Sequence, residues 1–197
     1  MLIGVAVLAV VAIGYLFYIK YQESKLGDIS FDNIETVQED GKIYLKNKAA
    51  DFSVIVSDSW IIENNKEAIS FASSDYEPSE GSDLAIPKNG CWIGSAVRIL
   101  DPKNDIEYQN VSSLLKDNNL QEINTERTQY KIISINGKNS LSESLIVNIK
   151  DEQGIFQTVK LLHNNKLYYF ETHLFGQQKD KCQEEFYNFL QTVSIKK

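Results

Sequence analysis

The side chains best suited to bind metals or transfer protons are few in this chain and lie far apart. Its two histidines are His163 and His173. If Asn164-Asn165 forms a tight turn, His173 lies about seven residues along the partner strand, and at ~3.3 Å per residue the two imidazoles are roughly 20 Å apart. They cannot share one metal ion, so we interpret each as a half-exposed strand residue rather than a ligand.

The two cysteines, Cys91 and Cys182, lack the CxxC spacing of a zinc site. An even pair outside the cytoplasm favours one disulfide, whereas the alternative is two buried free thiols. The sequence does not tell whether the two Cα atoms come within the ~7 Å that a bridge requires. A bridge would close a long loop and contribute about 4 kcal/mol on the chain-entropy model.

Four carboxylates fall in a stretch rich in proline and glycine, Ser73–Gly90. They are Asp75, Glu77, Glu80 and Asp83. The composition predicts a loop. Calcium binds several oxygen ligands, but the spacing does not match an EF-hand, so we interpret the stretch as a solvated acidic loop.

Motifs of known catalytic families are incomplete. Gly94-Ser95 is followed by Ala96 rather than by the residues of a nucleophile elbow. Gly137-Lys138 has the ending of a P-loop, but Ile132 stands where the motif requires glycine. We therefore predict no catalytic residue, no metal site and no cofactor, and we expect the protein not to be an enzyme.

The first nineteen residues, Met1–Ile19, contain no charged side chain. As a helix they would span roughly 28 Å, close to the ~30 Å hydrocarbon core of a bilayer. We predict a single-pass transmembrane helix, with four residues at the membrane interface: Tyr15, Tyr18, Lys20 and Tyr21. A cleaved signal peptide is the alternative, but no Lys or Arg precedes Lys20 to form its basic region.

All charged residues follow this apolar segment, so the net charge of −7 belongs to the remainder of the chain. Such an acidic body is repelled by phosphate backbones, which disfavours nucleic acid as a partner. The predicted organisation is an anchor and its exit at 1–26, a linker at 27–42 and one domain at 43–197. The two lysines near the span weakly favour a cytoplasmic domain, whereas the domain's acidity and its cysteine pair favour an extracytoplasmic one, which is our prediction.

Strand-like alternation and turn signals recur along the domain. Asp40-Gly41 and Asn136-Gly137 are hairpin signals, and the second opens an antiparallel meander. The predicted strands cover 43–46, 52–56, 68–72, 91–100, 125–134, 141–149, 155–162 and 167–175.

Two helices complete the predicted α+β fold, in which an antiparallel sheet packs against helices. The first is capped by Asn104 or Asp105 and ends at 117–119. The second begins at an Asp180 cap and has an apolar stripe formed by Cys182, Phe186, Phe189, Leu190 and Val193.

This order of elements resembles the PsbP/Mog1-like fold over about Tyr44 to Ile195. The resemblance rests on a strand, turn and tryptophan at Asp51–Trp60, on the hairpin Ile135–Lys138, and on a last strand and closing helix at Tyr168–Phe170 and Phe186–Ile195. Members include photosystem accessory proteins, a Ran-binding factor and anchored bacterial proteins. The resemblance implies binding or assembly rather than catalysis, and no functional residue carries over by a matching motif.

The expected function is therefore a membrane-tethered, non-enzymatic binding or assembly module of the cell envelope. Its partners would be the lipid bilayer, through residues 1–19, and a protein. Two alternatives remain. One is a hydrolase or metal-dependent enzyme with a dispersed site, for example Asp75, Glu77 and a histidine. The other is a structural subunit of an envelope complex with a large apolar patch on the exposed side of the meander.

Overall fold

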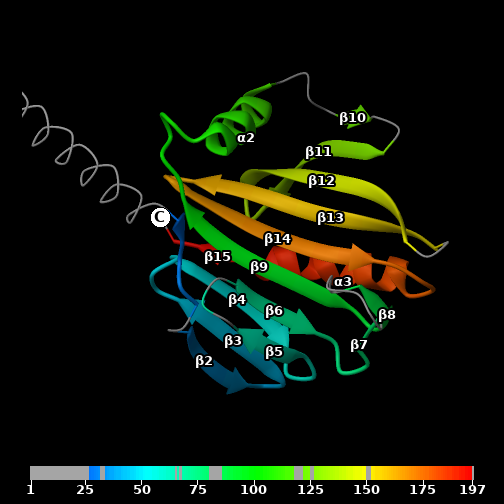
Figure 1. Cartoon of the computed structure of the whole chain (residues 1–197). Coiled ribbons are helices and arrows are strands. Elements are labelled where there is room, and N and C mark those ends of the chain that lie inside the picture. The colour runs from blue at the N-terminus through cyan, green and yellow to red at the C-terminus, as the bar shows by residue number, and fades with distance from the viewer. Residues whose placement is uncertain are drawn as a thin grey trace, which may run out of the picture.

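A computed structural model shows an antiparallel main sheet, a smaller second sheet and two helices in the part of the chain it describes (Figure 1). The described residues are 27–31, 34–64, 66, 68–79, 86–117, 122–124, 127–149 and 152–196. The anchor predicted at 1–26 and its interface residues lie outside these ranges. None of the helices within them is long and apolar enough to cross a membrane.

Four consecutive strands form one half of the main sheet, and they confirm the predicted meander. Their bounds are β11 (Thr128–Ile135), β12 (Lys138–Ile149), β13 (Glu152–His163) and β14 (Lys166–Leu174). The hairpin between β11 and β12 turns at Asn136-Gly137, whose φ angles of 46° and 77° are those that this dipeptide tolerates best. Short turns thus place each strand beside its neighbour in the sequence.

The other half of the main sheet comes from earlier parts of the chain. β14 pairs with β9 (Trp92–Ile99), and β9 in turn pairs with β6 (Ala68–Ala72). The sheet is completed by β5 (Ile61–Asn64), β10 (Glu122–Asn124) and the short β1 (Gly27–Asp28). Because β9 lies between β14 and β6, residues more than a hundred positions apart share one surface.

The second sheet has the order β15-β4-β3-β2. Its strands are β2 (Ile34–Glu39), β3 (Lys42–Asn47), β4 (Phe52–Ser57) and β15 (Ser194–Ile195). The segment 27–42 is therefore not a linker, and that prediction is wrong. Its strand β1 pairs with β9, β2 pairs with β3, and the Phe31 side chain is fully buried. The pairing of β1 with β9 is long-range and leaves no local pattern, whereas β2 and β3 are joined by the hairpin predicted at Asp40-Gly41.

The predicted loop Ser73–Gly90 contains a short pair of strands in its described part. β7 (Glu77–Pro78) pairs with β8 (Pro87–Asn89), and the Ser79 N–H donates to the Ile86 carbonyl at 2.8 Å. Two short paired strands therefore lie within the stretch that the sequence predicts as a loop.

Helix α2 (Ile106–Lys116) begins where the sequence predicts. The Asp105 carboxylate accepts hydrogen bonds from the backbone N–H groups of Glu107 at 2.9 Å and Tyr108 at 3.0 Å, as an N-cap does. Asp105 rather than Asn104 is therefore the cap.

Helix α3 (Lys179–Thr192) starts one residue before Asp180, so the predicted Asp180 cap is wrong. Gln178 holds the cap position and makes no capping bond through its side chain, while Asp180 lies in the first turn. The apolar stripe of this helix is confirmed: Cys182, Phe186, Phe189, Leu190 and Val193 are all buried.

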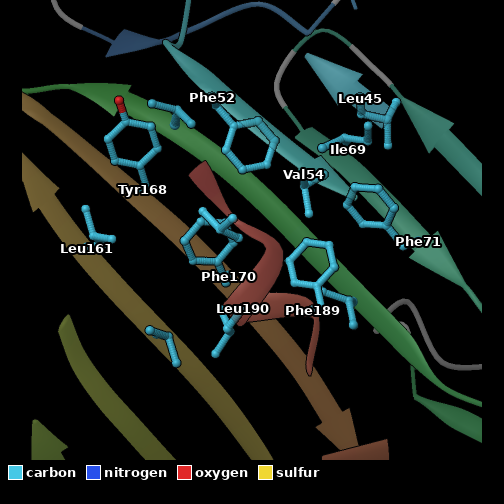
Figure 2. Packing of buried hydrophobic residues seen from close by; sticks show 14 of the residues in the cluster. Leu45, Phe52, Val54, Ile69, Phe71, Leu161, Tyr168, Phe170, Phe189 and Leu190 are labelled. Atoms are coloured by element: carbon cyan, nitrogen blue, oxygen red, sulfur yellow. The ribbon is translucent and has the colours of Figure 1, made fainter. Parts of the chain in front are cut away.

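Alternation along β14 assigns the helices to opposite faces of the main sheet. Tyr168 and Phe170 belong to the main core with Phe186, Phe189 and Leu190 of α3, whereas Leu167 and Tyr169 pack with Val111 of α2. The face of the main sheet that carries Tyr168 and Phe170 is called the inner face, and it also packs on β4 through Phe52 (Figure 2). The face that carries Leu167 and Tyr169 is called the outer face. The predicted α+β fold, an antiparallel sheet packed against helices, is thus confirmed for the described residues.

Candidate functional site

The outer face carries a groove of about 590 Å³ beside the first turn of α2, called here the outer groove. Its volume falls within the ~300–1,000 Å³ of small-ligand sites. The polar and aromatic residues that line it come from β5, β6, β9, α2 and β14, and they are Glu63, Asn64, Ser70, Trp92, Ser95, Arg98, Glu107, Tyr169 and Glu171. None of these was singled out from the sequence as a site residue.

The floor of the outer groove consists of small residues held in register. Ser70 of β6 lies opposite Gly94 of β9, and the neighbouring pair on the same face is Ala68 opposite Ala96. On the other side of β9, Gly94 lies opposite Glu171 of β14. Because these side chains on two adjacent strands are small, they leave a depression in the sheet surface between the larger lining residues, and this depression is the groove.

Gly94 permits a close approach of the side chains around it. A Cβ atom at Gly94 would lie 2.6 Å from Cη2 of Trp92 and 3.0 Å from Oε1 of Glu171. The first distance is shorter than any that real Cβ atoms show, so glycine lets the indole edge lie this close above the backbone, with the Glu171 carboxylate beside it.

One wall of the groove is held by a network of polar contacts around Glu107. The Tyr169 hydroxyl donates to Oε2 of Glu107 at 2.7 Å, and Nη1 of Arg98 donates to the same oxygen at 3.3 Å. Nζ of Lys160 lies 3.3 Å from the other oxygen, Oε1. Burial, followed by the hydrogen bond to Glu107, raises the pKa of Tyr169 well above its usual range. The Glu107 carboxylate is thus matched by two cations, and it fastens α2 to the sheet.

Two other carboxylates of the groove, those of Glu63 and Glu171, have no ion pair or side-chain hydrogen bond within the described part of the chain. Glu171 is exposed, and its strand neighbours in the groove are the small residues Gly94 and Ser70. The Trp92 indole lies next to Gly94 and Glu171, and its ring centroid is 5.0 Å from that of the His173 imidazole. The groove therefore presents unpaired negative charge and an aromatic ring.

The two histidines lie at opposite ends of the β13–β14 hairpin. His163 lies opposite Lys166 beside the turn, and its Nδ1 is 3.2 Å from Nζ of Lys138. His173 lies opposite Phe156, is only 8% exposed, and stacks between that ring at 4.2 Å and Trp92. Their separation along the hairpin agrees with the sequence estimate, and the surroundings of His173 are more buried than the predicted half-exposed position.

The acidic loop places its described carboxylates against cations. Asp75 accepts from the Ser73 hydroxyl at 2.6 Å and lies 3.7 Å from Nζ of Lys181, while Glu77 lies 3.9 Å from Nζ of Lys88. The Ser73 hydrogen bond, more than the Lys181 charge, lowers the pKa of Asp75. Glu80 and Asp83 lie outside the described residues.

Across the described ranges, no three His, Cys, Asp or Glu side chains come close enough to hold a metal ion. The dispersed site of Asp75, Glu77 and a histidine is therefore not assembled as a metal centre.

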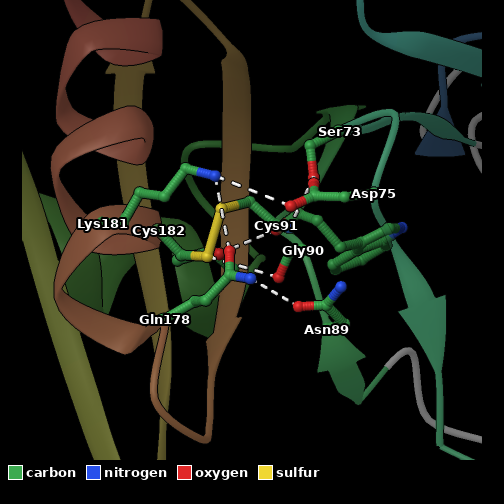
Figure 3. Close-up of a disulfide and its surroundings, with 10 residues drawn as sticks. Ser73, Asp75, Asn89, Gly90, Cys91, Gln178, Lys181 and Cys182 are labelled. Atoms are coloured by element: carbon green, nitrogen blue, oxygen red, sulfur yellow. Dashed lines mark hydrogen bonds and ion pairs between the residues drawn. A yellow bond between two sulfur atoms is a disulfide. The ribbon is translucent and has the colours of Figure 1, made fainter.

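Cys91 and Cys182 form a disulfide whose Cα atoms are 5.2 Å apart (Figure 3). Both residues are buried, and the bridge joins the first turns of α3 to the residue just before β9. Around it, the Ser73 hydroxyl accepts from the Cys91 N–H at 2.8 Å, and Gln178 donates to the side chain of Asn89. The corner that carries Trp92 into the groove is thus tied to the helix on the inner face.

Comparison with known proteins finds no matching family model and no matching curated protein. Solved structures are similar at low identity. A protein from Bacteroides thetaiotaomicron VPI-5482 is 13% identical over 81% of this chain and 50% of its own, with a TM-score of 0.49. This chain thus spans about half of that protein's length.

Two smaller proteins overlap over most of their length. LpqN, involved in cell envelope biogenesis of Mycobacterium tuberculosis, is 8% identical over 84% of this chain and 91% of its own, with a TM-score of 0.48. Cyanobacterial PsbP (CyanoP) from Synechocystis sp. PCC 6803 is 8% identical over 84% and 99%, with a TM-score of 0.45. At these identities and TM-scores nothing about the function of this chain follows from the likeness. The PsbP/Mog1-like resemblance implied an antiparallel sheet between helices. The strand order shows that sheet, and the two core clusters place α3 and α2 on its opposite faces.

Proposed function

We propose that this protein is a non-enzymatic binding or assembly module, held at the membrane by its apolar segment 1–19, and that its partner lies in the outer groove. The groove is the observation that carries the proposal. It lies on the side of the sheet that α3 does not cover, and it combines a low floor with an indole and two unpaired carboxylates. Such a surface suits recognition because its polar groups are not already committed to the fold.

The disulfide supports an extracytoplasmic location for the domain. Disulfides persist in oxidising compartments and are rare in the reducing cytosol. With the charge-free first nineteen residues, this favours a domain that hangs from the outer surface of a membrane. We therefore propose the cell envelope as its site of action.

Site-specific photocrosslinking in cells tests the binding proposal. A photoreactive residue at Ser70, on the groove floor, is expected to give a discrete adduct with a defined partner, which is identified by mass spectrometry and by reciprocal purification. The same residue at Glu184, an exposed position of α3, serves as the control. Adducts of equal yield at both positions, or none at Ser70, would contradict the proposal.

Protease protection tests the location. Protease is added to cells whose outer layers have been permeabilised while the cytoplasmic membrane stays sealed, and it should degrade the domain. The undigested protein should fractionate with membranes. Protection until the membrane itself is dissolved would place the domain in the cytoplasm and refute this part of the proposal.

A further inference from the structure

We propose that the outer groove binds a cationic side chain, an arginine or lysine on an exposed segment of a partner protein. The guanidinium or ammonium group would lie over the Trp92 indole and beside the Glu171 carboxylate, with Glu63 on the opposite wall. This inference rests on the proposed function and names the chemistry of its ligand.

The first step is the convergence of a ring and a carboxylate. The Trp92 ring edge and Oε1 of Glu171 both lie within 3.0 Å of one point above Gly94. A cation over this pair of side chains would contact the indole, the most favourable ring for such contacts, and would donate a charge-assisted hydrogen bond to the Glu171 carboxylate. A planar guanidinium satisfies both contacts at once.

The second step is the charge balance of the groove. Arg98 is the one cation that lines it, and Arg98 lies 3.3 Å from Glu107, whose other oxygen contacts Lys160. Glu63 and Glu171 remain without a cation among the described residues. An anionic ligand would be repelled by these carboxylates, and a neutral sugar would leave both uncompensated, whereas a cation offsets them.

The third step is the shape of the site. Glu63, Ser70, Gly94 and Glu171 lie in one row across β5, β6, β9 and β14, because each residue is paired with the next. Strands lie ~4.8 Å apart, so roughly 14 Å separates the backbone at the two carboxylates. This is room for a basic side chain together with the backbone that carries it, which favours a protein segment over a lone metal ion.

Titration of the full chain with a capped peptide of alternating glycine and arginine tests the inference. The matched probe replaces arginine with citrulline, which has nearly the same shape and no charge. The arginine peptide is expected to shift the indole N–H resonance of Trp92 and not that of Trp60, and to bind at least about tenfold more tightly than the citrulline peptide. Equal affinities of the two peptides would overturn the inference.

Two substitutions sharpen this test. Glu171→Gln should weaken binding of the arginine peptide about tenfold, whereas Glu184→Gln, an equal charge change at an exposed site on α3, should leave it unchanged. Equal loss in both variants would mean non-specific charge attraction and would refute the site. If Ser70 still crosslinks to a partner but the peptide does not bind, the cation inference fails alone. If both fail, the proposed function fails as well.

Discussion

The two faces of β14 differ in what their alternate residues contact. Tyr168 and Phe170 point into a core closed by α3 and β4, where both are fully buried. Tyr169 and Glu171 point to the outer face, where one is half-buried under the end of α2 and the other is exposed in the groove. The same strand thus contributes to the buried core on one side and to the lining of the outer groove on the other.

Polar groups follow the same division. On the inner face, Gln157 is 1% exposed and its amide donates to the Tyr187 hydroxyl at 2.9 Å and to Ser142 at 3.3 Å, within the core. On the outer face, the Glu107 contacts fix the helix, and the carboxylates beyond it stay accessible to solvent. The amide N–H groups of Gln157 are thus used within the core, although its Oε1 has no partner there among the described residues, whereas the carboxylates of Glu63 and Glu171 face solvent.

The largest effect should come from the inner face. Phe170 lies between Phe52, at a centroid distance of 6.0 Å, and Phe189, at 6.1 Å. Phe170→Ala should lower the free energy of unfolding by about 3–5 kcal/mol, because it removes a buried ring and leaves a cavity. Urea denaturation measures the change. A loss below about 1 kcal/mol would show that this core is not closely packed.

Loss of the disulfide should come next. Replacing Cys91 and Cys182 by serine should lower the free energy of unfolding by about 2–4 kcal/mol, because the bridge closes a long loop and constrains the unfolded chain. Thermal unfolding of the oxidised protein, the reduced protein and the double variant measures the change. A reducing agent should shift the wild-type midpoint and leave the double variant unchanged. A wild-type unfolding midpoint that stays the same with and without the reducing agent would contradict the disulfide.

Alkaline pH tests one phenol on each face. Burial raises the pKa of both Tyr168 and Tyr169 above the ~10 of an unfolded chain. Below pH ~10 both phenols are neutral in either state and their contribution is intact. Above it the unfolded chain loses protons that the folded chain retains, so stability falls as the pH rises.

Urea midpoints from about pH 9 to about pH 11 should show this decline, and Tyr168→Phe with Tyr169→Phe should flatten it. The hydroxyl of Tyr168 donates to the Ala50 carbonyl and that of Tyr169 to Glu107, so each substitution should also cost about 1 kcal/mol at neutral pH. An equally steep decline in the double variant would assign it to other groups.

The smallest effect on stability should come from the groove. Glu171→Gln should change the free energy of unfolding by less than about 0.5 kcal/mol, because the side chain is exposed and makes no hydrogen bond or ion pair within the described fold. Denaturation under the same conditions as for Phe170→Ala measures the contrast. If the two substitutions cost similar amounts, the division between a stabilising face and a recognition face would be wrong.

Local signals account for what the sequence predicted correctly. Asn136-Gly137 forms its hairpin because both residues tolerate positive φ, and Asp105 caps α2 because its carboxylate reaches two free N–H groups. The apolar stripe of α3 is buried because residues three and four apart share one side of a helix. Each of these depends on neighbours within a few positions.

Predictions that depended on distant residues did not succeed in the same way. Residues 27–31 have no strong pattern of their own, yet Gly27 pairs with Ile99 and Phe31 is buried. Asp180 has the residue type of a cap, but the hydrogen bonds of α3 begin earlier, where Gln178 follows the turn out of β14. For residues 27–31 the contacts with distant strands decided the structure, whereas the cap of α3 differs from the prediction by two residues.

The groove shows this most clearly. A sequence reader could notice the alternate small residues Gly94 and Ala96 in β9 and Ala68 and Ser70 in β6. Nothing in either segment says that the two strands are adjacent, or that Glu171 lies on their other side. The amino-acid sequence by itself determined the turns, the helix faces and the alternation of each strand, since these arise from contacts between near neighbours. Only the tertiary structure decided which strands lie side by side, and hence which carboxylates and rings meet, because strand pairing joins residues with no fixed separation along the chain.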